Sequence, residues 1–206
     1  AIKRDVDQMY VILPFEKPFY EDKHQFPVHF VGHPLIDEIS NRNQVDEALF
    51  KKENGLDQRP IIAILPGSRK QEISKMLEVM LSIVDDFSAY QFVIAGAPSQ
   101  DKLFYTSMIK TPNVHLLLNK TYDLLSISYA ALVTSGTATL ETALFKVPQV
   151  VCYKGNQISY EIAKRIIKLK YISLVNLILD REVVTELIQS EFNKKRVSQE
   201  LTKILD

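Results

Sequence analysis

The sequence has one cysteine, no net charge and no long apolar run, and each of these absences excludes a class of protein. The single Cys152 excludes an internal disulfide framework and any zinc or iron–sulfur site built from several cysteines. Lysine and arginine number 25, as do aspartate and glutamate, so no overall charge favours nucleic acid or an anionic membrane. No stretch approaches the roughly 18 to 20 apolar residues of a spanning helix, and the first ten residues lack the apolar core of a signal peptide. We therefore expect a globular protein that is neither exported nor membrane-spanning.

Familiar nucleotide and metal patterns are also missing. No Gly-Lys-Ser/Thr follows a glycine-rich loop, and no three spaced glycines form a dinucleotide pattern, so ATP and NAD are poor candidates. His24, His29 and His115 have no ligand-like spacing, so we expect no metal site.

Apolar runs of strand length alternate with segments of helical period, which is typical of a parallel sheet covered by helices. Strands are predicted at residues 9–13, 29–31, 61–65, 91–95, 114–118, 131–134 and 149–153. Apolar side chains between Ile73 and Val84 recur at spacings of three and four, which predicts a helix of about four turns. Further helices are predicted at residues 45–52, 100–109, 122–129, 139–145, 159–169, 182–192 and 194–205.

This order predicts an α/β fold with a Rossmann-like, doubly wound parallel sheet, because short connections favour right-handed crossovers. Residues 36–155 would form that domain. The stretch MYVILPFE begins close to the first residue, so we interpret residues 1–35 as the remnant of an N-terminal domain with a linker. Residues 156–206 carry weak strand signals and predict a C-terminal helical extension packed elsewhere.

The first candidate loop follows the strand that ends at Leu65, because open parallel sheets bind ligands beyond the carboxyl ends of their strands. In LPGSRKQEI, Ser68 stands three residues before Gln71, which predicts a capping box with Ser68 as the helix N-cap. Free N–H groups, the helix dipole and the guanidinium of Arg69 could then bind a diphosphate. A capped helix whose arginine lies in solvent explains the pattern equally simply, and the capping pattern alone favours that alternative.

The second candidate loop, SGTATLE, again leads from a buried strand into a helix. Gly136 permits close backbone approach, while Ser135, Thr137 and Thr139 bring hydroxyls to a helix N-terminus. Glu141 lies one turn further, where a carboxylate can accept hydrogen bonds from a vicinal diol such as a ribose. A first-turn acid that complements the helix dipole is an equally good interpretation.

Six strings resemble the lipid-A-disaccharide synthases in order and spacing: LPFE, FVGHPLID, LPGSRKQEI, SGTATLE, VVCYK and YISLVNLI. They extend over nearly the whole chain, and six motifs in register are far more specific than any one of them. The resemblance implies the GT-B architecture, in which two Rossmann-like halves face each other across a cleft. This chain would be the C-terminal half, which holds the donor nucleotide.

The implied reaction is an inverting transfer of 2,3-diacylglucosamine from UDP-2,3-diacylglucosamine to 2,3-diacylglucosamine 1-phosphate. It yields the lipid A disaccharide 1-phosphate and UDP, and it needs neither a metal nor a cofactor. The family's general base is attributed to the N-terminal half, which would also bind the lipid acceptor, so we expect this chain alone to bind UDP weakly and to be inactive. The family resemblance further implies a cytoplasmic location, peripheral to the inner membrane, no nucleic-acid partner, and compatibility with a homodimer.

The resemblance also assigns residues. Arg69 matches the family's arginine near the diphosphate and would stabilise the leaving group, and Asn176 matches a functional asparagine. The family commonly has proline before that asparagine, whereas Val175 stands here, and asparagine in a turn is often a local backbone hydrogen-bonder. The other nucleotide-binding candidates are Gly67, Ser68, Glu72, Ser135, Gly136, Thr137, Ala138, Glu141 and Tyr153.

Other motifs and families are weighed beside this assignment. Glu16 and His33 are interpreted as hinge or structural residues. Residues 161–174 mix basic and apolar side chains as an interfacial helix would, although a solvated basic face is the simpler interpretation. The peptidoglycan N-acetylglucosaminyltransferases and the UDP-N-acetylglucosamine 2-epimerases are the nearest rivals, but their characteristic strings are absent. A non-catalytic sugar-nucleotide-binding module stays open.

Overall fold

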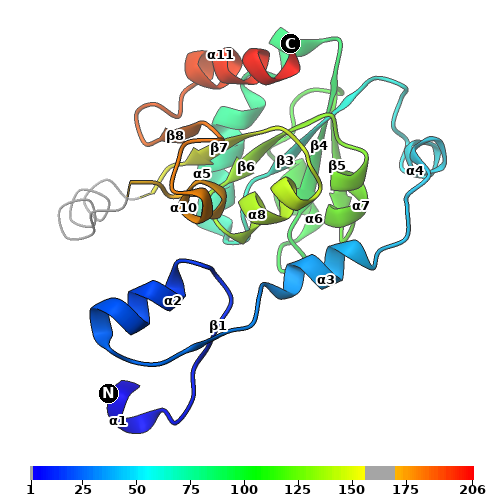
Figure 1. Cartoon of the computed structure of the whole chain (residues 1–206). Coiled ribbons are helices and arrows are strands. Elements are labelled where there is room, and N and C mark those ends of the chain that lie inside the picture. Colours follow the sequence, from blue (N-terminus) through cyan, green and yellow to red (C-terminus); the bar gives the residue numbers. More distant parts are fainter. Residues whose placement is uncertain (1, 156–169) are drawn as a thin grey trace.

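The computed structural model describes residues 2–155 and 170–206. The helix predicted at residues 159–169 and most of the basic segment therefore lie outside the described residues. A parallel sheet with helices on both faces forms the main body, and the N-terminal elements lie to one side of it (Figure 1).

The main sheet has six parallel strands in the order β5-β4-β3-β6-β7-β8. The strands are β3 (Ile61–Leu65), β4 (Gln91–Gly96), β5 (Val114–Leu118), β6 (Ala130–Thr134), β7 (Gln149–Tyr153) and β8 (Glu186–Ile188). The chain builds outward from β3 to β5 and then returns to the other side of β3, where Ile62 pairs with Ala130 of β6. Strand order thus reverses between β3 and β6, which makes this the topological switch point of the sheet. The predicted fold class is confirmed.

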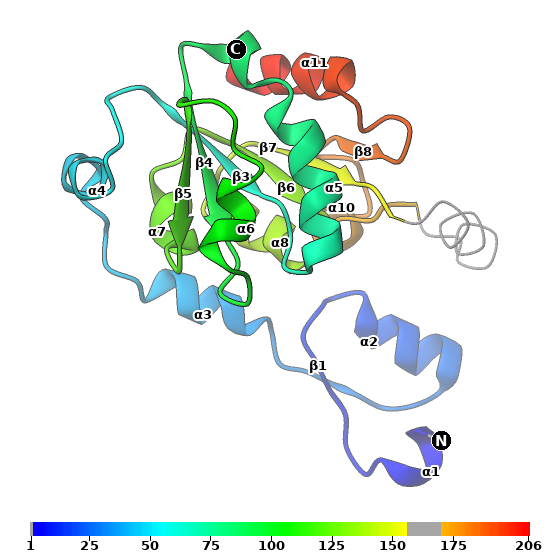
Figure 2. The ribbon, with the colours of Figure 1, turned by 180° about the vertical axis from the view of Figure 1, so that it is seen from behind.

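Alternate residues of each strand face opposite layers of helices, which is why the central strands are mostly apolar. Ile62 and Ile64 pack toward α5 (Lys70–Leu81), α6 (Lys102–Thr106) and α11 (Lys194–Leu205). Ile61 and Ala63 pack toward α4 (Glu47–Glu53), α7 (Thr121–Ser126) and α8 (Thr137–Leu144). Figure 2 shows α5 and α6 on the face opposite to α8. A 3-10 helix, η2 (Val84–Phe87), follows α5.

Cys152 lies in the first of these apolar layers and is fully buried. Burial raises the pKa of its thiol, since the thiolate would lose its hydration there. Cys152 is therefore a buried thiol that packs as an apolar side chain.

The N-terminal elements precede the main sheet, and the last of them contacts α8. They are α1 (Ile2–Asp5), β1 (Tyr10–Val11), α2 (Glu16–Pro18), the π-helix η1 (Phe19–Lys23), β2 (His29–Phe30) and α3 (Pro34–Ser40). Strands β1 and β2 pair in parallel and make a separate two-stranded sheet. Glu16 Oε2 accepts a hydrogen bond from the Leu13 N–H at 2.7 Å, and His33 Nδ1 caps α3 by accepting from the Leu35 N–H at 3.2 Å.

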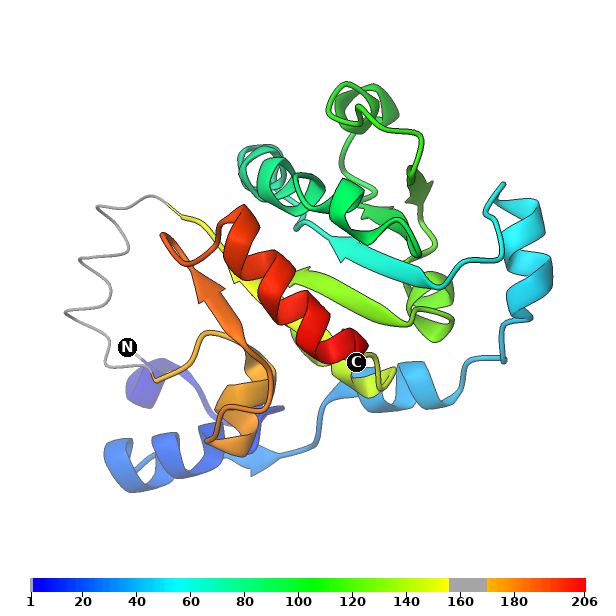
Figure 3. The same ribbon diagram turned by 90° about the horizontal axis from the view of Figure 1, so that it is seen from above.

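The C-terminal segment corrects one prediction. The helix predicted at residues 182–192 is wrong, because residues Glu186–Ile188 form β8 and pair with β7. Val184, Leu187 and Ile188 have helical spacing, but burial of Leu187 in the sheet overrides that local pattern. Helix α10 (Leu174–Leu179) precedes the strand, and α11 lies alongside β7 and β6 (Figure 3). The segment is therefore not an all-helical extension packed elsewhere: it completes the sheet and covers one face of it.

No helix in the described part of the chain is long and apolar enough to cross a bilayer.

Candidate functional site

A cavity of about 440 Å³ opens at the carboxyl edge of the sheet, beyond the ends of the paired strands β3 and β6. This is the position at which open parallel sheets bind ligands, because the loops of the two half-sheets part there. The cavity is lined by Leu65, Gly67, Ser68, Glu72, Ala95, Ala97, Pro98, Thr121, Thr134, Ser135, Gly136, Thr137, Ala138 and Glu141. It thus brings together most of the predicted nucleotide-binding residues from both candidate loops.

The first loop turns at Gly67, and its geometry corrects the predicted capping box. The N-cap of α5 is Arg69 in an extended conformation, with no side-chain cap, so the prediction of Ser68 as N-cap is wrong. Instead, the Glu72 carboxylate reaches back and accepts from the Ser68 N–H at 3.4 Å. Gly67 has φ of +101°, and a Cβ there would collide with that carboxylate. Gly67 and Glu72, rather than Ser68 and Gln71, therefore shape the start of the helix.

The same loop is tied to its neighbour across the cavity edge. The Ser68 carbonyl accepts hydrogen bonds from Ser99 Oγ at 3.3 Å and from Gln100 Nε2 at 3.0 Å. Arg69 is exposed, does not line the cavity, and forms no ion pair with any residue the structure describes. Its long side chain is thus available to a ligand at the start of α5.

The second loop turns at Gly136, the N-cap of α8, with φ of +154° and ψ of −163°. This conformation is essentially restricted to glycine, and the space where a Cβ would stand is open. The first N–H groups of α8 have no partner within the helix, so they can bind an anion that approaches this open backbone.

Two of the three hydroxyls predicted to face a ligand instead donate hydrogen bonds to backbone carbonyls. Ser135 Oγ donates to the Ile172 carbonyl at 2.8 Å, and Thr139 Oγ1 donates to the Gly136 carbonyl at 2.8 Å. Thr139 is fully buried, so it supports the loop rather than facing a ligand. Thr137 is exposed at the cavity and makes no side-chain hydrogen bond within the described ranges.

Glu141 lines the cavity one turn into α8, and Tyr122 of α7 orients it. The Tyr122 hydroxyl donates to Glu141 Oε1 at 2.9 Å. Burial, and then this hydrogen bond, raise the pKa of Tyr122 to about 12, so the phenol stays a proton donor at neutral pH. Glu141 therefore offers the cavity a carboxylate that is already partly fixed.

Thr134 is a lining residue that the motif reasoning missed. It is the last residue of β6, its side chain is buried, and its Oγ1 has no hydrogen-bond partner among residues 2–155 and 170–206. Buried hydroxyls are usually paired, so this Oγ1 is an exception at the end of β6, beside the cavity. Thr121, after β5, also lines the cavity and lies outside both candidate loops, although β5 ends at the same edge of the sheet.

Besides Arg69, two predicted site residues are not part of the cavity lining. Tyr153 ends β7 and is half-buried, with its hydroxyl near Gly155. Asn176 is fully buried, and both ends of its amide are engaged. Its Nδ2 donates to Glu186 Oε1 and to the Val184 carbonyl, both at 2.8 Å. Its Oδ1 accepts from two backbone N–H groups, so Asn176 holds the chain between α10 and β8.

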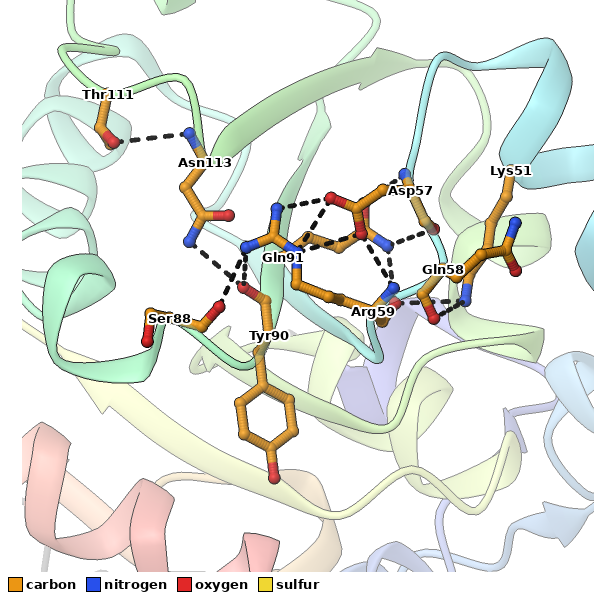
Figure 4. A network of polar contacts seen from close by, with 9 residues as sticks. All are labelled: Lys51, Asp57, Gln58, Arg59, Ser88, Tyr90, Gln91, Thr111 and Asn113. Carbon is orange, nitrogen blue, oxygen red and sulfur yellow. Dashed lines mark hydrogen bonds and ion pairs between the residues drawn. The ribbon is translucent and has the colours of Figure 1, made fainter.

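A second polar network lies at the amino edge of the sheet, opposite the cavity (Figure 4). Arg59 Nη2 donates to Asp57 at 2.6 Å, and Arg59 Nη1 donates to the Ser88 carbonyl at 3.0 Å. The hydrogen bond from Arg59 holds the pKa of Asp57 below its usual range. Gln91 Nε2 donates to the carbonyls of Asp57 and Arg59 at 2.8 and 2.6 Å. These contacts join the loop before β3 to the start of β4, which is a structural task.

No group of three or more histidine, cysteine, aspartate or glutamate side chains in the described ranges is arranged to hold a metal ion.

Comparison with solved structures shows which proteins share this fold. The UDP-GlcNAc 2-epimerase of Methanocaldococcus jannaschii, solved with UDP-GlcNAc and UDP, superimposes with a TM-score of 0.64 at 12% identity, over 97% of this chain and 54% of that one. The ADP-heptose lps heptosyltransferase II of E. coli gives a TM-score of 0.50 at 14% identity, over 87% of this chain and 54% of that one. At such identities the likeness concerns the fold alone, a Rossmann-like half of the GT-B kind.

Sequence comparison identifies the family. The lipid-A-disaccharide synthetase family model matches residues 1–206. The lipid-A-disaccharide synthase of Syntrophus aciditrophicus is 39% identical over 97% of this chain and 54% of its own length. That of Geobacter metallireducens is 37% identical over 100% of this chain and again 54% of its own length, so this chain spans about half of each relative. Six strings in register, a cavity between two helix N-termini at the switch point and these matches agree: the chain belongs to the lipid-A-disaccharide synthetase family.

Proposed function

We propose that the cavity between α5 and α8 binds the uridine diphosphate of a sugar-nucleotide donor, and that this chain is the donor-binding half of a glycosyltransferase. The observation that carries the proposal is the convergence of two helix N-termini, the open backbone at Gly136 and the carboxylate of Glu141 on one cavity. Helix N-termini favour phosphate, and a carboxylate favours the hydroxyls of a ribose.

The proposed reaction is the one that the resemblance to the lipid-A-disaccharide synthases implies. The complete enzyme would transfer 2,3-diacylglucosamine from UDP-2,3-diacylglucosamine to 2,3-diacylglucosamine 1-phosphate, with inversion, and release UDP. The glycosidic bond to the donor sugar breaks as the acceptor hydroxyl attacks, so negative charge grows on the departing diphosphate. The acceptor proton goes to a general base.

Within this chain, the N-termini of α5 and α8 and the guanidinium of Arg69 would stabilise the charge on the leaving diphosphate. A hydrogen bond to a charged group is worth about 1.5–3 kcal/mol, whereas a helix dipole contributes about 0.3–1 kcal/mol, so Arg69 should dominate. Its exposed side chain, one residue before α5, is long enough to fold over a diphosphate bound there.

Each of the two carboxylates that line the cavity makes a contact within the protein, and Glu141 is also assigned to the ribose. Glu72 accepts from the Ser68 N–H, and Glu141 accepts from the Tyr122 hydroxyl. This supports a general base outside this chain, in the half of the relatives that it does not span. We therefore propose that the chain alone binds UDP but does not turn over, and that the complete enzyme works at the inner membrane surface from the cytoplasmic side, where its lipid substrates lie.

Calorimetric titration with UDP tests the proposal. Arg69→Ala should weaken UDP binding by about 10- to 100-fold. Lys75→Ala is the matched control, because it removes one exposed positive charge from the same helix without touching its start, and it should change the affinity by less than about twofold. Unchanged affinity in Arg69→Ala would refute the diphosphate assignment. Turnover by this chain at the rate of a full-length relative would refute its role as a half-site.

A further inference from the structure

The contact between Tyr122 and Glu141 joins helix α7 to helix α8. Tyr122 lies in the first turn of α7, and its hydroxyl donates to Glu141 Oε1 at 2.9 Å. The other carboxylate oxygen, Oε2, has no hydrogen-bond partner in the part of the chain that the structure describes, and Glu141 lines the cavity. A glutamate side chain rotates about three torsions, so without this contact a ligand would have to order it on binding.

The ring of Tyr122 is itself held from two sides. Its centroid lies 5.5 Å from that of Phe145, at the end of α8. The second contact is with Arg42, whose guanidinium carbon lies 5.2 Å from the Tyr122 ring centroid. Arg42 follows α3, and its Nη2 is fixed by Asp123 Oδ1 at 2.6 Å. The phenol is thus clamped between the segment after α3 and the end of α8.

We propose that Tyr122 is a positioning residue for the ligand diol: its hydroxyl fixes Glu141 so that the free carboxylate oxygen accepts from the ribose of the bound nucleoside diphosphate, while Arg42 fixes the Tyr122 ring. This inference rests on the proposed function and extends it to two residues outside the six motifs. Because the pKa of the phenol is raised, the donor remains protonated throughout the physiological range.

The inference requires that the Tyr122 hydroxyl, through Glu141, affects binding of the ribose hydroxyls and of no other part of the ligand. Calorimetry of the 206-residue chain with UDP and with 2′,3′-dideoxy-UDP, which lacks both ribose hydroxyls, separates these effects. Tyr122→Phe keeps the ring and removes the hydroxyl, and it should weaken UDP binding by about three- to tenfold. The dideoxy analogue should bind the variant and the parent within about twofold of each other. The preference of the chain for UDP over the analogue should therefore shrink by the same three- to tenfold factor.

Two further variants complete the design. Tyr129→Phe is the matched control, because Tyr129 directly precedes β6 and its hydroxyl donates to the Leu205 carbonyl at 3.4 Å. Both ligands should bind this variant as they bind the parent. Arg42→Met removes the guanidinium but leaves the Tyr122 hydroxyl, and should weaken UDP binding by about two- to threefold, again sparing the analogue.

The outcomes separate the two claims. Absence of UDP binding by the unsubstituted chain would overturn the proposed function, and this inference with it. Binding of UDP that Tyr122→Phe leaves unchanged would overturn the inference alone. An equal loss of affinity for both ligands in Tyr122→Phe would also overturn it, since that pattern means general disturbance of the cavity.

Discussion

Replacing Asn176 by alanine separates a structural role for this side chain from a role in nucleotide binding. The asparagine is fully buried, and alanine would leave the N–H groups of Val183 and Val184 and the carbonyl of Val184 without their partner. Each buried polar group that loses its partner costs about 1–3 kcal/mol. Water that enters the space recovers part of this, so we expect a loss of about 3–5 kcal/mol from a total stability on the order of 5–15 kcal/mol.

Urea denaturation followed by circular dichroism measures that loss, and UDP titration of the folded variant measures binding. We expect the affinity for UDP to stay within about twofold of the parent value. Asn193→Ala is the matched control, because Asn193 is exposed and caps α11, and it should cost only about 0.5–2 kcal/mol. If Asn176→Ala keeps the stability of the parent and loses UDP affinity, the reasoning is refuted and the asparagine contacts the nucleotide directly.

Two further changes probe the backbone and the pH response. Gly136→Ala forces alanine into a conformation that only glycine adopts readily, so the free energy of unfolding should fall by about 1–3 kcal/mol in urea denaturation, and an unchanged value would contradict the strain argument. Burial lowers the pKa of His115 below its ordinary 6.5, so the folded state binds a proton at this side chain less readily than the unfolded state does. The neutral histidine therefore contributes its full share of stability above pH 6.5, and this share is lost as the pH falls through the folded pKa. Between pH 7 and 5, His115→Gln should therefore lose less stability than the parent, whereas parallel declines would show that His115 does not carry this pH dependence.

Much of the fold could be predicted because its signals are local. Strands β3 and β7 lie at their predicted bounds, since each is a short run of buried residues between turn signals. Helix α11 also lies at its predicted bounds, because an asparagine cap precedes an amphipathic segment. The two candidate loops could be located for a topological reason: both follow central strands of a parallel sheet, and such loops converge on one edge.

The remainder depends on contacts between distant residues. Strand β8 has only three residues, and its pairing with β7, rather than its own spacing, makes it a strand. The start of α5 depends on a carboxylate that reaches back to Ser68, which the Ser68 and Gln71 pattern concealed. Asn176 matched a motif, but only the fold reveals that Val183, Val184 and Glu186 surround its amide. Sequence pattern identifies which residues are unusual, whereas packing decides what they contact.

The reversal of strand order between β3 and β6 also constrains how the cavity can assemble. Strands β3 to β5 are contiguous in the chain, as are β6 to β8, and the two units join where Ile62 pairs with Ala130. Pairings so far apart in sequence form late and slowly, because a long intervening segment must be ordered first. During refolding, nucleotide binding would therefore appear later than the collapse of the β3–β5 unit or the β6–β8 unit. Its appearance would report the time at which the two units pair.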